Sequence, residues 1–373
     1  MNTEIRLMVI AGEISSDRHG AKLITELKKS ENVKVIAVGG AKMAEVSDRL
    51  EENIVGKATI GFAEVVKLIP FFAGLKKRLV RKYFKSGSED RVDAVILIDF
   101  PGFNMRIAKI AASSGIPVFY YITPQVWAWG KKRIDILSNI CRKLYCLFEF
   151  EKDIFSQAGA NVEFVGHPIL EDIPAMIDME AFNSELGISE EEKVIALLPG
   201  SRENEVKRHL PVMTAAVKDA GYRIILGKSP TIDKELINSI YPGVDMTEDI
   251  YGLLKRADVA IVSSGTTTLE SAVLGTPFIT VYKVSNISYA IARMLVNIEY
   301  ISMVNILAGR EVVPELIQGD LTAGNIKEKL EKILGSDDER QWMISELERV
   351  SRMIGEPGAS GRTARSILDE LGS

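Results

Sequence analysis

One segment of the chain reads Val262-Ser-Ser-Gly-Thr-Thr-Thr-Leu-Glu-Ser-Ala-Val-Leu-Gly-Thr-Pro-Phe-Ile-Thr-Val-Tyr282. The apolar run Val259–Val262 predicts a buried parallel strand that ends where this segment begins. A glycine and three threonines then lead into an apolar-periodic helix that ends at Gly275, just before a proline. The run Phe278–Val281 predicts the next strand. This succession of strand, short turn, helix and strand is typical of an open α/β sheet.

The turn between that strand and that helix has the features of an anion site. Unpaired N–H groups and the positive end of the helix dipole attract anions at a helix start. Gly265 lets the backbone approach a phosphate closely, and Thr266 to Thr268 add hydroxyl donors. Glu270 lies about one turn into the helix, where its carboxylate can reach ribose hydroxyls beside the phosphate. Taken alone, the segment is better explained as an ordinary turn capped by serine and threonine, so the rest of the chain must decide.

Bulk composition bounds the class of protein. The chain has 373 residues, which is enough for two domains with separate cores. Its net charge of −5 argues against nucleic acid as the main partner. Its two cysteines, Cys141 and Cys146, are too few for a disulfide framework and have no histidines at metal-ligand spacing. The N-terminus resembles no signal peptide and no apolar run reaches about 18 residues, so we expect a cytoplasmic protein, either free or on the cytosolic face of a membrane.

The first half of the chain alternates predicted strands and helices. Strands are predicted to end at Gly12-Glu13 and at Gly39-Gly40, and Ser15-Ser16-Asp17 is expected to cap the helix after the first of them. No GxGxxG pattern follows the first strand, which argues against a dinucleotide-binding domain. The alternation predicts a parallel, doubly wound sheet with its site at the carboxyl ends of the strands.

Asp99 follows the buried strand Val92–Ile98, at the position where open α/β sheets keep catalytic groups. A carboxylate there is costly unless it is paired or used in chemistry. The alternative is that Asp99 caps the next helix, which is expected to begin near Asn104. Farther along, Trp127 and Trp129 share a loop that could form a sugar or acyl surface or simply wall the cleft.

Residues 65–88 reverse the charge of the chain locally. From Val65 to Lys85 the chain has seven basic residues and no acidic one. Apolar residues recur at three- and four-residue steps: Leu68, Phe72, Leu75, Leu79 and Tyr83. Basic residues fill much of the rest of the helix: Lys76, Lys77, Arg78, Arg81, Lys82 and Lys85. This pattern predicts a helix lying on an anionic membrane surface, and a packed amphipathic helix with a solvated basic face is the alternative.

The second half repeats the alternation after a linker predicted over residues 171–192. Gly200 and Ser201 make a tight turn after the strand Val194–Leu198, and Arg202 offers a fixed-charge fork suited to phosphate oxygens. The sequence lacks a P-loop motif and a DxD-like pair after a strand, which predicts a metal-independent mechanism. The helix dipole and Arg202 would then take the charge of a leaving diphosphate. We expect an α/β chain with two doubly wound, Rossmann-like parallel-sheet domains facing across a cleft.

These pieces together resemble the lipid-A-disaccharide synthases, a family of GT-B-fold glycosyltransferases. The matching stretches occur in the family's order from residue 11 to about residue 318, and the ordered set is highly specific although no single stretch would suffice. They are Ala11-Gly-Glu-Ile-Ser-Ser-Asp17, Gly39-Gly-Ala-Lys-Met43, Ile98-Asp-Phe-Pro-Gly-Phe-Asn104, Tyr121-Ile-Thr-Pro-Gln-Val-Trp-Ala-Trp129, Phe164-Val-Gly-His-Pro168, Leu197-Leu-Pro-Gly-Ser-Arg202, Ser264-Gly-Thr-Thr-Thr-Leu-Glu270 and Asn305-Ile-Leu-Ala-Gly-Arg310. The chain departs from the usual pattern at Ser16, Ile60 and Met303-Val304.

The resemblance implies transfer of 2,3-diacylglucosamine from its UDP derivative onto 2,3-diacylglucosamine 1-phosphate, which gives a β-1,6-linked disaccharide 1-phosphate and UDP. An inverting transfer needs one general base beside the acceptor hydroxyl. We predict Asp99 as that base, with Glu13 and Glu64 as rivals and His19 as a weaker one. His167, in its Gly-His-Pro turn, is expected to be structural.

The resemblance also implies the remaining site residues and partners. The predicted catalytic set is Asp99, Glu13 and Arg202; the donor set is Gly200, Ser201, Arg202, Ile250, Ser264, Gly265, Thr266, Thr267, Glu270, Asn305 and Arg310; and the acceptor or membrane set is Glu64, Phe71, Phe72, Lys76, Lys77, Arg78, Trp127 and Trp129. No cofactor and no metal are expected. An acceptor-binding, membrane-facing domain is predicted over residues 1–170 and a UDP-sugar domain over 193–340, with a C-terminal helix of about 340–373 free to pack back on the first. The protein would be a monomer or a homodimer, peripheral on the cytosolic face of the inner membrane.

Two alternatives from other classes stay open at this level. A UDP-GlcNAc 2-epimerase would share the two-lobed fold but would need no membrane face, so residues 65–88 and the tryptophan loop speak against it. A nucleotide-sugar-binding module without enzymatic activity would have no need of a carboxylate such as Asp99 at a strand end.

Overall fold

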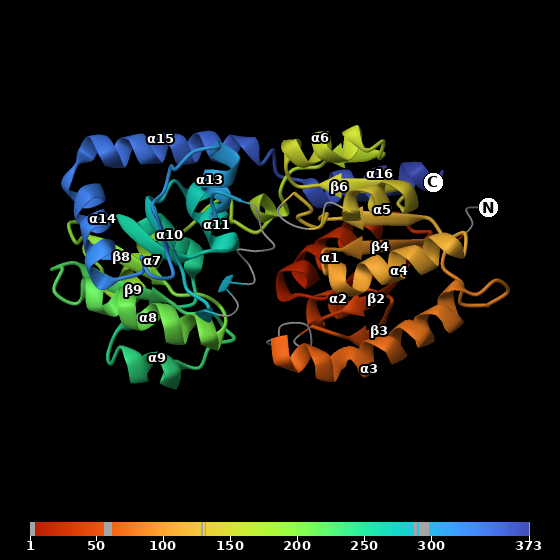
Figure 1. The fold of residues 1–373 in the computed structure, drawn as a ribbon, viewed down its shortest axis with the longest axis horizontal. Coiled ribbons are helices and arrows are strands. Elements are labelled where there is room, and N and C mark those ends of the chain that lie inside the picture. Colours follow the sequence, from red (N-terminus) through yellow and green to blue (C-terminus); the bar gives the residue numbers. More distant parts are fainter. Residues whose placement is uncertain are drawn as a thin grey trace. The chain divides into compact units, whose positions relative to one another are not determined.

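The computed structural model describes residues 4–55, 62–127, 130, 132–286, 289–290 and 298–372, with only the backbone given for 62–67. The chain divides into two compact units (Figure 1). The first comprises Met1–Pro168 together with Ile354–Ser373, and the second comprises Ile169–Met353. Each unit is an α/β sandwich with its own core, and each is described by itself.

The first unit is built on a seven-stranded parallel sheet of order β3-β2-β1-β4-β5-β6-β7. Its strands are β1 (Ile5–Ala11), β2 (Val33–Gly39), β3 (Arg49–Asn53), β4 (Ala94–Ile98), β5 (Val118–Tyr121), β6 (Lys143–Cys146) and β7 (Val162–Phe164). All five residues of β4 are buried, as expected for a central strand covered by helices on both faces. The strand order reverses between β1 and β4, and open α/β sheets bind ligands at the carboxyl ends of the strands at such a point.

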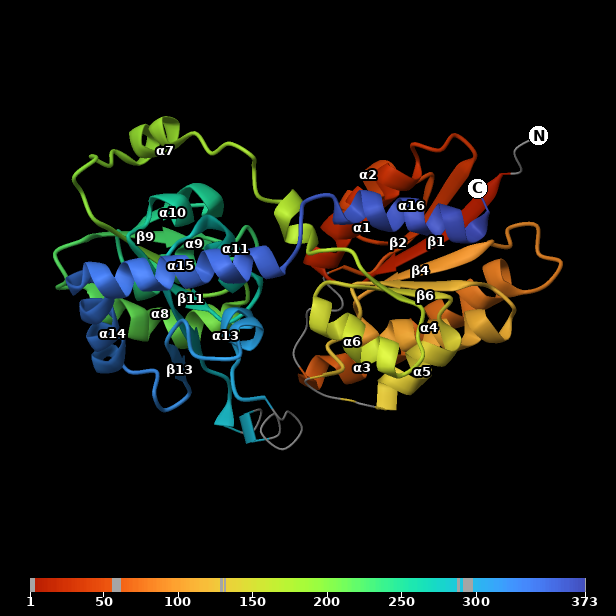
Figure 2. The same ribbon diagram turned by 90° about the horizontal axis from the view of Figure 1, so that it is seen from above.

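Among the described residues, eight helical segments pack around this sheet. They are α1 (Ile14–Leu27), α2 (Ala41–Val46), α3 (Phe62–Leu79), the π-helix Val80–Phe84, α4 (Pro101–Ser113), α5 (Lys132–Ile140), α6 (Glu149–Gln157) and, from the end of the chain, α16 (Ala359–Leu371). Figure 2 shows α16 running beside α1, against which it packs. The C-terminal helix therefore completes the first unit, although about 190 residues separate it from β7.

The second unit repeats the architecture with a six-stranded parallel sheet of order β10-β9-β8-β11-β12-β13. Its strands are β8 (Val194–Leu198), β9 (Arg223–Gly227), β10 (Asp245–Thr247), β11 (Val259–Ser263), β12 (Phe278–Tyr282) and β13 (Glu315–Ile317). Its helices are α7 (Met179–Leu186), α8 (Glu203–Val217), α9 (Lys234–Ile240), α10 (Ile250–Arg256), α11 (Thr266–Leu274), α13 (Met303–Ala308), α14 (Ala323–Gly335) and α15 (Asp337–Met353). The order reverses between β8 and β11, so the predicted pair of doubly wound parallel sheets is confirmed.

The segment expected to link the domains is partly helical. It contains α7, whose Phe182 is buried against Gly252 of α10. Contacts therefore assign Ile169 and the residues after it to the second unit, and a short 3-10 turn, Pro168–Glu171, spans the boundary.

Two helix starts differ from the sequence-based expectation. The N-cap of α1 is Glu13, so Ser15-Ser16-Asp17 lies inside the first turn and does not cap this helix. The Asp17 carboxylate instead accepts hydrogen bonds from the N–H groups of Gly40 (2.7 Å), Lys42 (3.0 Å) and Met43 (3.2 Å), and so holds the start of α2. Likewise α4 begins at Pro101 and not near Asn104, because proline suits the first helical turn.

The basic segment forms α3 and the π-helix that follows it. Leu75, Leu79 and Tyr83 are fully buried in the core of the first unit, so the predicted apolar face packs inward from residue 75 onward. None of the described helices combines the length and the apolar character needed to cross a membrane.

Candidate active site

Asp99 lies in a strained turn at the carboxyl end of β4. Asp99 and Phe100 have φ angles of 44° and 49°, in the left-handed region that side chains other than glycine rarely occupy. The Asp99 carbonyl accepts hydrogen bonds from the Tyr120 hydroxyl (2.7 Å) and from the Asn104 amide (2.8 Å). Two buried donors thus hold the backbone in this conformation, which fixes the direction of the Asp99 side chain.

Gly12, at the end of β1, has no room for a side chain. A Cβ atom there would overlap the ring of Phe100, which lies directly on the glycine backbone. The absence of a side chain at Gly12 therefore lets the ends of β1 and β4 meet at the switch point of the first sheet. Glu13, the next residue, is close enough to Asp99 for the two charges to interact.

The pKa of Asp99 is raised to about 6, mainly because burial disfavours the charged carboxylate. The negative charge of Glu13 adds to this rise, and a hydrogen bond from the Phe100 N–H opposes it. A carboxyl group with a pKa near 6 is ionised at neutral pH yet more basic than an ordinary aspartate. Those properties suit a general base that accepts a proton from a hydroxyl group.

Aromatic rings extend from Phe100 onto α3. Phe72 contacts Phe100 and Phe103, with ring centroids 5.7 and 5.3 Å apart, and Phe71 contacts Phe72 at 5.2 Å. Phe71 and Phe72 were predicted to belong to the acceptor side, and they form an apolar wall next to the Asp99 turn. Phe103 is buried in the core, whereas Phe71, Phe72 and Phe100 are partly exposed, so these three rings are accessible to an apolar ligand.

The basic side chains of α3 fall into two groups. Arg78 forms ion pairs with Glu52 (2.5 Å) and Glu51 (3.6 Å) of β3, so its charge is compensated within the unit. Lys76 and Lys77 form no ion pair with any carboxylate in the described part of the chain. Two other predicted acceptor residues, the side chain of Glu64 and Trp129, lie outside the described residues.

Trp127 is anchored by a carboxyl group that the sequence did not single out. Its indole N–H donates to Glu151 of α6 (3.1 Å), and the Leu147 N–H donates to the same carboxyl group (3.2 Å). Glu151 is buried, and burial raises its pKa to about 7 against the effect of these hydrogen bonds. In the sequence, Glu149 and Glu151 look like ordinary exposed acids, so nothing separated Glu151 from Glu149.

The second switch point begins with the turn after β8. Gly200 has a φ of 120°, and a side chain on it would overlap Glu205. The Glu205 carboxylate accepts from the N–H groups of Ser201 (3.1 Å) and Arg202 (3.3 Å) and pairs with the Arg202 guanidinium (3.0 Å). Arg202 itself is the N-cap of α8 and its side chain is about half exposed (54%). Glu205 supplies the acidic half of a capping box, but Arg202 stands where the sequence pattern has Ser or Thr, so the pattern alone did not identify Glu205.

The turn after β11 lies beside the turn after β8, because these two strands are paired. Gly265 and Thr266 are exposed at the start of α11, and the hydroxyl of Ser264 donates a hydrogen bond to the Ile301 carbonyl (3.1 Å). Glu270 is buried one turn into α11 and accepts from the Tyr251 hydroxyl (3.3 Å). Thr267 is partly buried in the same first turn, and Ile250 lies at the start of α10. The predicted donor residues of both turns thus lie at the carboxyl edge of one sheet.

Asn305 and Arg310 have internal partners. The Asn305 amide donates to the Val313 carbonyl and to Glu315 (2.8 Å each), while its oxygen accepts from the N–H groups of Val312 and Val313. Arg310 pairs with Glu346 of α15 (2.7 Å). The Asn305 side chain could contact a bound UDP-sugar only if one of these hydrogen bonds broke. We therefore expect any role of Asn305 in binding to be exerted through the loop that it orders.

His167 is buried, and burial together with the charge of His19 lowers its pKa to about 3. Its ring packs on Phe148, with ring centroids 5.6 Å apart, and its backbone N–H donates to the Ile354 carbonyl (2.8 Å). The His167 ring is neutral and packed, and the structural role expected for it stays a prediction.

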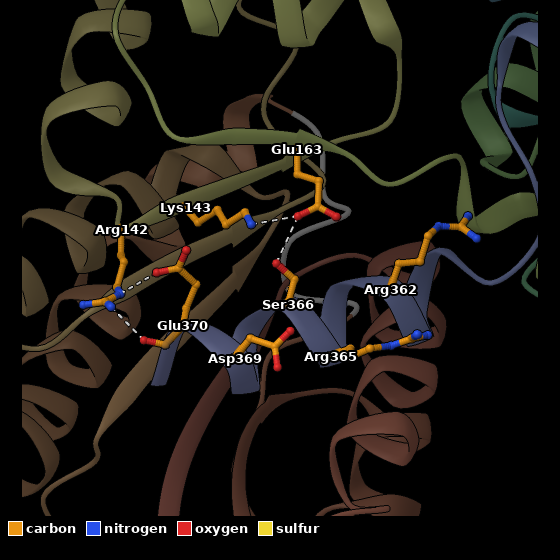
Figure 3. Close-up of a pocket in the computed structure, with 8 residues that line it drawn as sticks. All are labelled: Arg142, Lys143, Glu163, Arg362, Arg365, Ser366, Asp369 and Glu370. Atoms are coloured by element: carbon orange, nitrogen blue, oxygen red, sulfur yellow. Dashed lines mark hydrogen bonds and ion pairs between the residues drawn. The ribbon is translucent and has the colours of Figure 1, made fainter. Parts of the chain in front are cut away.

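A polar hollow of about 540 Å³ lies on the first unit between α16 and the β6–β7 edge (Figure 3). Internal bonds occupy most of its lining: Lys143 pairs with Glu163 (2.8 Å), Ser366 donates to Glu163 (3.0 Å), and Arg142 pairs with Glu370 (2.9 Å). Arg142 and Lys143 stand at the amino end of β6, away from the carboxyl ends where α/β sheets bind ligands. The hydrogen bonds and ion pairs that line the hollow therefore attach α16 to the sheet.

Among the described residues, no three His, Cys, Asp or Glu side chains are grouped as metal ligands would be.

Comparison with known proteins agrees with this geometry. A family model described as lipid-A-disaccharide synthetase matches residues 7–356. The lipid-A-disaccharide synthase of Myxococcus xanthus is 34% identical and that of Syntrophus aciditrophicus 38% identical, with 100% and 99% of this chain covered and 99% and 98% of theirs.

Solved structures share the fold at low identity. A UDP-GlcNAc 2-epimerase from Neisseria meningitidis bound to UDP-GlcNAc has a TM-score of 0.61 at 14% identity, with 98% of this chain and 99% of that chain covered. MurG from Acinetobacter baumannii has a TM-score of 0.59 at 15% identity, with the same coverage. These similarities identify a GT-B architecture, which epimerases and glycosyltransferases share.

Proposed function

Since the chain belongs to the lipid-A-disaccharide synthetase family and is a GT-B glycosyltransferase of lipid A disaccharide synthesis, we propose how its two switch points divide the reaction. The donor is UDP-2,3-diacylglucosamine and the acceptor is 2,3-diacylglucosamine 1-phosphate. The first switch point, with Asp99, activates the acceptor, and the second, with Arg202 and the start of α11, holds the UDP part of the donor.

The chemical step is a single displacement. The 6-hydroxyl oxygen of the acceptor attacks C1 of the donor sugar, and the bond from C1 to the β-phosphate oxygen breaks. The hydroxyl proton passes to the Asp99 carboxylate, and UDP leaves with both bonding electrons. The configuration at C1 inverts, which gives the β-1,6 linkage. The raised pKa of Asp99, next to an apolar wall of phenylalanines, is the observation that carries this assignment.

Charge on the diphosphate grows as the C1–O bond breaks. Arg202, half exposed at the N-terminus of α8, is oriented by Glu205 and could stabilise that charge together with the N–H groups at the start of α11. The Arg202→Ala variant should raise the KM for the donor and lower kcat, because the contact strengthens in the transition state. An unchanged kcat/KM would remove Arg202 from the site. Lys207→Ala, on the exposed face of the same helix, is the matched control.

No metal is needed in this scheme, because Arg202 and the helix N-termini supply the positive charge that stabilises the leaving diphosphate. Activity should therefore survive exhaustive treatment with EDTA, and a loss that Mg²⁺ restores would contradict the proposal.

One assay tests the function itself. UDP release is measured from UDP-2,3-diacylglucosamine with and without the monosaccharide 1-phosphate acceptor. A transferase releases UDP only when the acceptor is present, an epimerase requires no acceptor, and a binding module releases nothing. The family match favours the first outcome over the epimerases, whose structures share only the fold.

Both proposed substrates carry acyl chains, and we infer that α3 docks on the cytosolic leaflet of the inner membrane. Phe71 and Phe72 are only partly buried, and Lys76 and Lys77, which pair with no carboxylate among the described residues, can meet anionic headgroups. A Lys76→Glu/Lys77→Glu variant should bind poorly to vesicles containing phosphatidylglycerol in a flotation assay. Lys218→Glu/Lys234→Glu, an equal charge change on exposed residues of the second unit, is the control, and equal flotation of both variants would refute the docking face.

A further inference from the structure

His209 is a fully buried histidine in the middle of α8. Its Nδ1 lies 2.8 Å from the Pro199 carbonyl oxygen, and its Nε2 lies 2.9 Å from the Lys283 backbone nitrogen. A carbonyl oxygen can only accept and a backbone N–H can only donate. The ring must therefore be neutral, with its proton on Nδ1 and the lone pair of Nε2 receiving the Lys283 N–H.

These two bonds join two separate loops of the second unit. Pro199 opens the turn that carries Gly200 to Arg202, and Lys283 directly follows β12. In the sheet, β8 and β12 are the two neighbours of β11. His209 thus ties together the strand ends on either side of the β11 turn, where the diphosphate is proposed to bind.

Glu205 lies one helical turn before His209, on the same face of α8. It fixes the N–H groups of Ser201 and Arg202, while His209 fixes the carbonyl of Pro199 in the same turn. Glu205 and Arg202 both affect the pKa of Tyr282, the residue before Lys283: the charge of Glu205 raises it and that of Arg202 lowers it. The ammonium group of Lys283 forms no ion pair with a carboxylate in the described part of the chain, so this loop carries an uncommitted cation.

We propose that His209, in its neutral Nδ1–H form, is a positioning residue for the diphosphate of the donor, because it sets the spacing between the Arg202 turn and the Lys283 loop. The inference rests on the proposed function only in taking the second switch point as the donor site. Burial lowers the pKa of His209, and the nearby Arg208 lowers it further. Glu205 and the two backbone partners raise it, but burial is the larger effect, so the neutral form prevails at neutral pH.

Three variants separate the two hydrogen bonds. His209→Leu removes both, whereas a glutamine oxygen can replace Nε2 as acceptor for Lys283 and an asparagine amide can replace Nδ1 as donor to Pro199. Leu210→Ala, which empties a buried site on the same helix and removes neither hydrogen bond, is the control for lost stability. The readouts are the KM for the donor, the KM for the acceptor, the Kd for UDP and the Tm.

We expect His209→Leu to raise the donor KM and the UDP Kd at least tenfold while the acceptor KM stays within twofold of wild type. His209→Gln and His209→Asn should recover part of the affinity, and Leu210→Ala should lower the Tm without changing the UDP Kd. A His209→Leu protein with a lower Tm but unchanged UDP affinity would show that the residue is merely structural and overturn the proposal. If that variant does not fold, the glutamine and asparagine variants decide, since an unchanged UDP Kd in both would refute the positioning role.

The tautomer is checked on the wild-type protein. The chain has three histidines, so a two-bond ¹H–¹⁵N correlation spectrum with His19 and His167 variants assigns each ring. His209 should show the pattern of a neutral ring protonated on Nδ1, and a ring protonated on Nε2 would overturn the geometry on which the proposal stands. Failure of wild-type protein to release UDP with acceptor would instead refute the proposed function and leave the UDP-binding comparison intact.

Discussion

Replacing Asp99 by asparagine tests two effects of this carboxylate, its proposed contribution to kcat and its effect on the free energy of unfolding. Asparagine matches aspartate in shape and tolerates the left-handed backbone at φ 44°, so the turn should be preserved. A rise in the pKa of Asp99 from 3.8 to about 6 corresponds to about 3 kcal/mol of destabilisation once the carboxyl is ionised. The neutral amide avoids that cost.

The sign of the pH dependence follows from the direction of the shift. Below about pH 4 the carboxyl is protonated in both the folded and the unfolded chain, so wild type and variant should differ little. As the pH rises from 4 to 6, the unfolded chain loses its proton first, and wild-type stability falls relative to the variant. Above about pH 6 the difference should level off, with the variant more stable by about 3 kcal/mol.

Activity should change in the opposite direction. Loss of a general base lowers rates by about 10²- to 10⁴-fold, so kcat of Asp99→Asn should fall by that factor at pH 7.5. The wild-type kcat should rise with pH through about 6, and Glu13→Gln should move this rise to lower pH because it removes a neighbouring negative charge.

The measurements are initial rates of UDP release and urea unfolding followed by circular dichroism at pH 4 and 7.5, fitted with separate transitions if the two units unfold independently. Asp153→Asn, an exposed carboxylate on α6, is the control and should change neither quantity. An Asp99→Asn kcat within tenfold of wild type would remove Asp99 as the base. A stability difference that is the same at both pH values would show that its pKa is not raised.

Other substitutions test the framework around the two switch points. Gly12→Ala should destabilise the first unit by about 1–3 kcal/mol and lower kcat, because the new methyl group displaces a packed ring, whereas Gly102→Ala meets nothing and should be close to neutral in urea unfolding. Glu151→Gln should be more stable than wild type at pH 8 by up to about 3 kcal/mol, since its buried carboxyl has a pKa raised from 4.5 to about 7, and thermal unfolding should show the gain vanish toward pH 4. Asn305→Ala leaves two buried N–H groups unpaired and should cost about 2–4 kcal/mol by urea unfolding, while Asn325→Ala, at an exposed hydrogen bond, should cost little; equal losses would contradict the argument.

Much of the fold could be predicted because its strands are short apolar runs that end in glycine or a polar residue. β4 and β11 are buried along their whole length, so periodicity and composition locate them well. Asp99 could be singled out as a candidate for the same reason, since a charged residue at the end of an apolar run is unusual, and its catalytic role stays a prediction.

Residues whose role depends on distant partners could not be found in this way. Asp17 looks like a cap for its own helix, but its carboxylate reaches the start of α2, more than 20 residues away. His209 lies within an ordinary helical pattern, and its link to Lys283 spans 74 residues of sequence. Glu151 resembles any acid in a first helical turn until burial distinguishes it.

The return of α16 to the first sheet also has a bearing on how the chain folds. The first unit is interrupted between Pro168 and Ile354, and the bond from the His167 N–H to the Ile354 carbonyl (2.8 Å) holds the two ends of the interruption side by side. The second unit is thus a contiguous insertion, and during synthesis it is complete before the first unit receives its last helix. The surface of the first unit that binds α16 therefore stays exposed while residues 169–353 are synthesised. Replacing residues 169–353 by a short linker would remove this delay and yield the first unit as an independent domain.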